Sequence, residues 1–111
     1  MSYTAGCWIA QNVIGSGSCE GRLVRVHLIP RQLLKREFGK TLGAKLAEDE
    51  ATFVWACGGG LGIGGHHGRL DHSRTLRIER WTLPEAVETF AANHGLSWFL
   101  DREYGPLEAA A

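Results

Sequence analysis

A segment rich in glycine and histidine constrains the fold of this chain more than any other feature. Residues 57–72 contain seven of the chain's fifteen glycines, three of its five histidines and one of its three cysteines. Glycine loses more conformational entropy on folding than any other residue, so such a run needs a reason. The reasons known are positive φ angles, mobility, or close approach of the backbone to a bound group. The segment is therefore the first candidate for a functional site.

Four strands are expected outside this segment. Residues 22–29 and 74–81 alternate between apolar and polar side chains, which is typical of strands with one exposed face. Residues 7–14 are rich in strand-forming residues, and residues 52–57 form a short apolar run that predicts a buried central strand.

Local signals place the helices. Pro30 begins a basic region with apolar residues at every fourth position, and Gly39 is expected to break it into two short helices. Thr82 and Glu85 form the pattern of a capping box at the start of a further helix. Gly95 supplies the signal that ends this helix.

The predicted fold class is α+β. The amphipathic residues 96–104 favour a last helix capped by Ser97 over the alternative of an edge strand, and residues 105–111 form a short tail. Residues 1–111 are expected to form a single domain, an antiparallel sheet of about four strands with two to four short helices on one face. In this arrangement residues 57–72 are a long connection between the last two strands.

Composition narrows the classes of function. Twelve Lys and Arg residues balance twelve Asp and Glu residues, which argues against general attraction to nucleic acids or membranes. No apolar run approaches the roughly 20 residues of a membrane span, and the N-terminus lacks the pattern of a signal peptide. Three cysteines without close spacing do not suit a disulfide framework, so a reducing, cytoplasmic location is expected.

The segment at 57–72 offers ligands for a divalent transition metal. Its candidate ligands are Cys57, His66, His67, Asp71 and His72. All are side chains that bind borderline ions such as zinc. Their spacing matches no common zinc motif, and adjacent histidines on an extended backbone point to opposite sides. A metal site is therefore one of four alternatives for this segment.

Nucleophilic catalysis is the second alternative. Cys57 could act as the nucleophile, with His66 or His67 as the base and glycine N–H groups as an oxyanion hole. A cysteine that ends an apolar run is more often an inert core residue. The sequence leaves open whether the chain is an enzyme.

Anion binding is the third alternative. The glycines at 60, 62 and 65 match the spacing of a dinucleotide-binding motif, but no helical periodicity follows them, so the motif lacks its context. A looser anion site remains, with glycine amides assisted by arginines. Its candidate residues are Gly60, Gly62, Gly65, Arg69 and Arg74.

In the fourth alternative the segment is a plain connection, and the function lies on a surface. Trp81 falls on the polar side of its expected strand together with Arg77, and Arg25 lies on the polar side of another strand. Such a surface suits a protein partner or self-association. Stacking of single-stranded nucleic acid on this surface is less favoured because the net charge is zero.

The sequence thus predicts a small, non-catalytic interaction or regulatory module that binds a macromolecular partner. The alternative is a domain that binds a small ligand or a metal, with its site at residues 57–72 and with catalysis as one option. No complete catalytic motif decides between the two.

Overall fold

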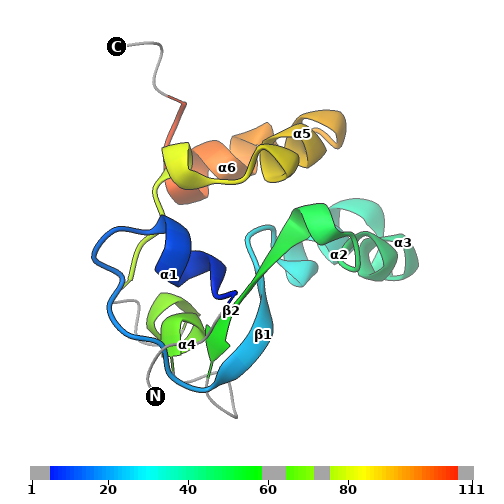
Figure 1. Ribbon diagram of the computed structural model, residues 1–111. Coiled ribbons are helices and arrows are strands. Elements are labelled where there is room, and N and C mark those ends of the chain that lie inside the picture. The colour runs from blue at the N-terminus through cyan, green and yellow to red at the C-terminus, as the bar shows by residue number, and fades with distance from the viewer. Residues whose placement is uncertain (1–5, 59–64, 72–75, 108–111) are drawn as a thin grey trace. The chain divides into compact units, whose positions relative to one another are not determined.

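The computed structural model describes residues 6–58, 65–71 and 76–107, apart from the side chains of Arg69 and Asp71. These residues form an α+β structure of short helices and one sheet (Figure 1). The strands β1 (Arg22–His27) and β2 (Phe53–Gly58) pair to form a two-stranded antiparallel sheet. The α+β class is confirmed, but the expectation of about four strands is wrong.

The chain divides into two compact units. Unit 1 comprises Met1–Val26 and Val54–Arg77, and unit 2 comprises His27–Phe53 and Ile78–Ala111. Both boundaries fall inside the strands, so each unit contains part of β1 and part of β2. That the whole chain forms one domain stays a prediction.

Unit 1 contains two short helices, α1 (Trp8–Asn12) and α4 (Gly65–Asp71). Helix α1 replaces the strand predicted over residues 7–14. Its single turn buries Ile9 completely and leaves the polar residues that follow exposed, so tertiary burial outweighs strand propensity. Helix α4 lies in the segment that was expected to be a long connection between two strands, and Figure 1 shows it near the end of β2.

The strand predicted over residues 74–81 is also wrong within the part that the structure describes. Residues 76–79 have no regular structure, and η2 (Arg80–Thr82) is a 3-10 turn. The alternation of burial is nevertheless present, because Ile78 and Arg80 are buried while Arg77, Glu79 and Trp81 are exposed. The sequence pattern thus predicts which side chains face inward, although residues 76–82 form no strand.

Among its described residues, unit 2 contains four helices and two 3-10 turns: α2 (Arg31–Phe38), α3 (Lys40–Leu46), η1 (Glu50–Thr52), η2, α5 (Glu85–Asn93) and α6 (Ser97–Tyr104). The predicted break at Gly39 is confirmed, because Gly39 separates α2 from α3 with a φ of 90°. The two helices cross closely at Gly43, where a Cβ would lie 2.4 Å from the Cα of Lys35.

Helix α5 is present as predicted, but its start differs. The N-cap position is Pro84 and no side chain caps the helix, whereas the hydroxyl of Thr82 donates to the carbonyl oxygen of Glu79 at 2.6 Å. The predicted capping box is therefore wrong. The predicted stop at Gly95 is confirmed by its φ of 69°, and the N–H of Leu96 closes the end of the helix.

Helix α6 confirms the predicted last helix. Its N-cap position is Leu96 and no side chain caps it, so the prediction of Ser97 as N-cap is wrong. At its other end the hydroxyl of Tyr104 donates to the carbonyl oxygen of Leu28 at 2.6 Å. This bond ties the end of α6 to the chain that leaves β1.

A buried arginine links several elements of unit 2. Arg80 is 6% exposed, and its guanidinium donates to both carboxylate oxygens of Glu88, at 2.7 and 2.9 Å. It also donates to Asp101 at 2.6 Å and to the carbonyl oxygen of Gly105 at 2.9 Å. The hydrogen bond to Glu88 raises the pKa of Arg80 further above its ordinary value, against the opposing effect of burial. Arg80 thus joins η2, α5 and α6.

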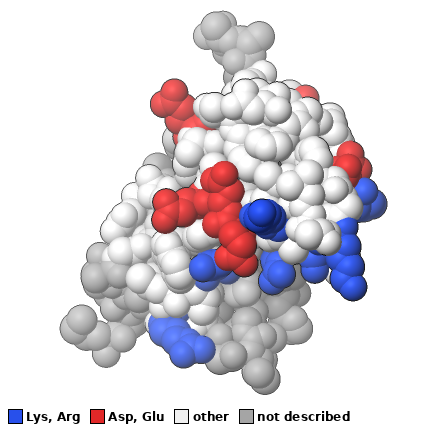
Figure 2. Space-filling view, turned by 90° about the vertical axis from the view of Figure 1, so that its right-hand side faces the viewer, with Lys and Arg blue, Asp and Glu red and all other residues white. Residues whose placement is uncertain are grey.

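Charges of both signs occur on the surface. In Figure 2, acidic and basic side chains lie beside each other on the face that is shown, in keeping with the net charge of zero. Among the described residues no helix has the length and apolar character that a bilayer crossing requires.

Candidate metal centre

Four buried side chains of unit 1 converge on one point: Cys7, Cys19, Cys57 and His66. Their ligand atoms all lie within 4.8 Å of one another. The Nδ1 atom of His66 is 3.1, 3.4 and 3.9 Å from the three sulfur atoms. In a tetrahedral zinc site, bonds of about 2.3 Å to sulfur and 2.0 Å to nitrogen place these atoms about 3.6 Å apart. The observed distances lie on both sides of this value.

The second ring nitrogen fixes the orientation of His66. Nε2 lies 3.1 Å from the carbonyl oxygen of Ser16 and 3.1 Å from that of Gly17. Because a carbonyl oxygen only accepts hydrogen bonds, Nε2 carries a proton, and in the neutral ring Nδ1 then presents its lone pair to the sulfur atoms. Metal-binding histidines are commonly held in this way by a backbone carbonyl.

Backbone N–H groups point at two of the sulfur atoms. The N–H of Cys57 donates to Cys7 at 3.4 Å, while Glu20 and His66 donate to the sulfur of Cys57 at 3.4 and 3.2 Å. Burial alone would raise the pKa of the Cys7 thiol, but hydrogen bonds from the backbone of Ala10 and Cys57 and from the neighbouring thiols outweigh it and lower that pKa. These bonds favour the thiolate form, which is the form that binds metals.

Each ligand comes from a different part of unit 1. Cys7 precedes α1, Cys19 follows the turn at residues 15–17, Cys57 lies near the end of β2, and His66 lies in the first turn of α4. Gly65 allows the approach of α4, because its φ is 62° and a Cβ there would lie 2.4 Å from the carbonyl oxygen of Glu20 and 2.9 Å from that of Cys57. A side chain at position 65 would push His66 away from the sulfur atoms.

Two of these four residues, Cys57 and His66, are among the metal ligands predicted from the sequence. His67 is half-buried beside Gly58 and is not a member of the cluster. His72 and the side chain of Asp71 lie outside the described residues.

Cys7 and Cys19 were missed because they lie far from Cys57 in the sequence, 50 positions in the case of Cys7. A signal was nevertheless present. The chain has three cysteines, an odd number that disulfides cannot use up, and three thiols with one histidine form a recognised ligand set for zinc. The cysteine count is therefore compatible with a metal site as well as with a reducing compartment.

Most of the residues proposed for anion binding lie where the structure gives no description. Gly60, Gly62, Arg74 and the side chain of Arg69 lie outside the described residues. The expectation that no helix follows the glycines is wrong, because α4 begins at Gly65. Gly65 itself packs against backbone oxygens beside the cluster, so its conformation has a structural cause.

The proposed interaction residues lie on the surface. Trp81 is 69% exposed and its indole N–H donates to Glu79, while Arg25 and Arg77 are exposed in unit 1. Residues 52–57 were expected to form a buried strand, but Trp55 on β2 is 47% exposed, so that expectation is wrong at this residue. The guanidinium carbon of Arg25 lies 5.7 Å from the centre of the Trp55 ring, which is within the range of a cation–π contact.

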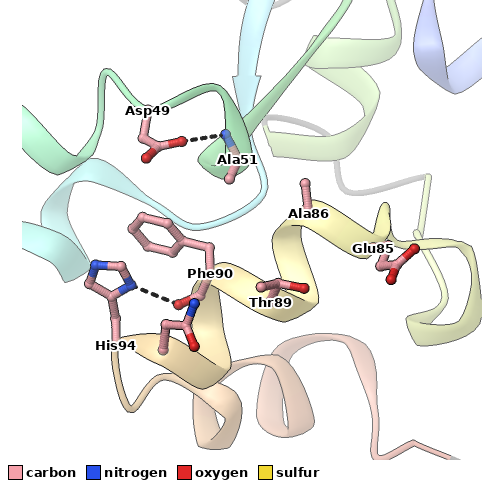
Figure 3. Close-up of a pocket in the computed structure, with 8 residues that line it drawn as sticks. Asp49, Ala51, Glu85, Ala86, Thr89, Phe90 and His94 are labelled. Carbon is pink, nitrogen blue, oxygen red and sulfur yellow. Dashed lines mark hydrogen bonds between the residues drawn. The ribbon is translucent and has the colours of Figure 1, made fainter.

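A shallow groove of about 500 Å³ lies in unit 2, and no residue of it was predicted as a site. Figure 3 shows residues of α5 facing the segment that carries Asp49 and Ala51. The carboxylate of Asp49 accepts the N–H of Ala51 at 2.9 Å, and Nδ1 of His94 donates to the carbonyl oxygen of Phe90 at 2.8 Å. Both polar groups therefore already bond to neighbouring backbone, and the groove has no cluster of reactive side chains comparable with that of unit 1 among the described residues.

The cluster of unit 1 is thus the place where the structure concentrates metal-binding chemistry. Comparisons with protein-family models, with curated proteins and with solved structures find no match to this chain.

Proposed function

We propose that this chain is a non-catalytic module that binds one structural zinc ion and contacts a macromolecular partner through its surface. The zinc ligands are Cys7, Cys19, Cys57 and His66. The observation that carries the proposal is the convergence of these four buried side chains, with ligand atoms within 4.8 Å of one another. Three thiolates and one imidazole are a common ligand set of structural zinc sites.

The burial of the cluster supports a structural role for the metal. Cys7, Cys57 and His66 are 0% exposed and Cys19 is 4% exposed. Four protein ligands complete a tetrahedral zinc site, whereas catalytic zinc keeps one position open for water or substrate. The same burial leaves Cys57 without the access that a nucleophile needs.

The energetics of the cluster also favour a bound metal. Thiolates that are buried without a counter-charge are costly, and Zn²⁺ would offset most of the charge of three thiolates. The ion would join Cys7 and Cys19, which flank α1 and its turn, to β2 and α4. Binding of the metal would therefore contribute directly to the folding of unit 1.

The surface supports the proposal of a partner. Three tryptophans are substantially exposed among the described residues: Trp55 at 47%, Trp81 at 69% and Trp98 at 42%. Exposed aromatic side chains of this size are typical of interaction sites, because their burial in a complex contributes much of the binding energy.

Elemental analysis of untagged protein purified without chelators tests the metal site. We expect about one zinc per wild-type chain and loss of most of it in the Cys57→Ser and His66→Ala variants. His67→Ala is the matched control, because His67 is the next residue of α4 and is not a member of the cluster. It should retain the metal.

Cobalt substitution identifies the ligands. Replacement of zinc by Co²⁺ should give a thiolate-to-cobalt charge-transfer absorption that weakens when any one cysteine is replaced by serine. A wild-type chain without metal would contradict the proposal. Equal loss of zinc in the His66→Ala and His67→Ala variants would contradict it too.

A further inference from the structure

We infer that the surface formed by Trp55 and Arg25 binds single-stranded nucleic acid, with a base stacked on the indole and a phosphate paired with the guanidinium. The inference rests on the proposed function, because the zinc cluster includes Cys57, two residues beyond Trp55 on β2. The metal would hold the strand that presents the indole.

The two paired strands place Trp55 and Arg25 next to each other on the surface. Trp55 is the one exposed residue of β2, since every other residue of that strand is buried. Arg25 is exposed on the paired strand β1, and its guanidinium carbon lies 5.7 Å from the centre of the Trp55 ring. The guanidinium thus lies over the indole ring, and an aromatic ring with a cation–π arginine is a combination found in proteins that hold single strands.

The distribution of charge favours a polyanion. The segments of unit 1 contain five arginines and two acidic residues, a net charge of +3, whereas unit 2 contains seven basic and ten acidic residues, a net charge of −3. One zinc with three thiolates would add a single negative charge and leave unit 1 at +2. The net charge of zero, which argued against binding of nucleic acid, is thus the sum of a positive charge on unit 1 and a negative charge on unit 2.

The exposed charged side chains of unit 1 are mostly basic as well. Besides Arg25, the described residues of unit 1 include the exposed arginines Arg22 and Arg77, against one exposed acidic residue, Glu20. Several guanidinium groups on one small unit suit a ligand with repeated phosphates. A single strand is favoured over a duplex, because the indole can stack only on a base that is already unstacked.

Unit 2 provides a natural control. Trp98 is 42% exposed, and the guanidinium carbon of Arg102 lies 5.2 Å from the centre of its ring. The pair has the same chemistry as Trp55 and Arg25 but belongs to the acidic unit. If an exposed tryptophan with an arginine were sufficient, both pairs would bind. If the positive charge of unit 1 is required, only the first pair would bind.

Fluorescence anisotropy of a labelled single-stranded oligothymidylate, titrated with the zinc-loaded full chain, tests the inference. We expect saturable binding that weakens as salt is added. Trp55→Ala should lower the affinity about tenfold, from the loss of one stacked base, and Arg25→Gln should lower it by a smaller factor and reduce the salt dependence. Trp98→Ala should leave the affinity unchanged.

Three results would overturn the inference. These are no binding of the zinc-loaded chain at low salt, equal weakening by Trp55→Ala and Trp98→Ala, and equally tight binding of a duplex. Loss of self-association in Trp55→Ala, measured by sedimentation in the absence of binding to the oligonucleotide, would make the surface a contact between copies instead. Trp55→Phe keeps an aromatic face, and it should bind more tightly than Trp55→Ala.

The zinc content of each sample separates this inference from the proposed function. A zinc-loaded chain that does not bind the oligonucleotide overturns the inference alone. A chain without zinc that still binds through Trp55 supports the surface and overturns the metal site. If Trp55→Ala loses zinc, the comparison uses Trp55→Phe and Arg25→Gln, which must retain zinc and show weaker binding.

Discussion

The two units of this chain bury different kinds of residue. Among the described residues, unit 1 buries four apolar side chains besides its cysteines: Ile9, Val26, Val54 and Ala56. Unit 2 buries fourteen: Leu28, Ile29, Leu33, Leu34, Ala47, Phe53, Ile78, Leu83, Val87, Phe90, Ala91, Leu96, Phe99 and Leu100. Unit 1 buries three cysteines and a histidine instead. A ligand cluster thus takes the place of a hydrophobic core.

The two units therefore depend on different interactions for their stability. A small unit with few buried apolar side chains needs a metal or another cross-link to stay folded. Unit 2 has a hydrophobic core and the buried network of Arg80, and neither involves a metal ligand. Perturbing the metal and perturbing the core should therefore affect different parts of the chain.

Removal of the metal should have the largest effect. Structural zinc supplies about 10–16 kcal/mol of apparent binding free energy in zinc-finger peptides, far more than most single contacts. Chelation should abolish the protection of backbone amides in α1 and α4 while leaving that of α5 and α6. Hydrogen exchange followed by mass spectrometry measures both units in one sample. Unchanged protection of α1 and α4 after chelation would show that unit 1 does not depend on a metal.

Gly65→Ala should have the next largest effect. The new Cβ would lie 2.4 Å from a backbone oxygen in a left-handed conformation, so the variant should lose about 2–4 kcal/mol of metal-binding free energy. Gly15→Ala is the control, because Gly15 has a φ of 75° but no atom within 4 Å of the new Cβ. It should lose only about 1 kcal/mol. Competition with a chromogenic chelator measures both, and equal losses would argue against close packing at Gly65.

Arg80→Met should destabilise unit 2 alone. It leaves Glu88 and Asp101 without their buried partner, and because Asp101 is more than half exposed we expect a loss of about 2–3 kcal/mol. Arg36→Ala, which removes an exposed contact with Glu37, should cost less than about 0.5 kcal/mol. Urea denaturation gives these values. The zinc content of Arg80→Met should equal that of the wild type, and its loss would contradict the separation of the two units.

Tyr104→Phe should have the smallest effect. It removes the hydroxyl that donates to the carbonyl oxygen of Leu28 at 2.6 Å, a bond worth about 1 kcal/mol. Thr82→Ala removes a hydroxyl bond at an exposed position and should cost less than about 0.5 kcal/mol. Thermal unfolding compares the two variants. If Thr82→Ala costs as much as Tyr104→Phe, the end of α6 is not held by this bond.

The parts of the fold that follow from local chemistry could be predicted from the sequence. Gly39 breaks the basic helical region and Gly95 ends α5, because each glycine adopts a positive φ at a helix end. Helix α1 could not be predicted in this way, since its five residues include strand formers and its conformation depends on the burial of Ile9. The strand expected near Ile78 is absent although burial alternates through Arg80, whose guanidinium binds Glu88, a partner that alternation does not reveal.

Only two of the four metal ligands could be predicted from the sequence, because the other two are distant along the chain. Cys57 and His66 are near each other in the sequence, so their chemistry was visible in one segment. Cys7 and Cys19 join them only because the chain folds back over many residues. The glycines that drew attention to the segment include Gly65, whose role is to let α4 approach the sulfur atoms.

X-ray absorption spectroscopy at the zinc edge gives the decisive test of the zinc site, since it reports the atoms bound to the metal in the wild-type chain. We expect a four-coordinate zinc with three sulfur atoms at about 2.3 Å and one nitrogen atom at about 2.0 Å. The His66→Ala variant should lose the nitrogen contribution of the imidazole, and His67→Ala should retain it. A shell of oxygen and nitrogen atoms without sulfur, or a chain that holds no metal, would contradict the account.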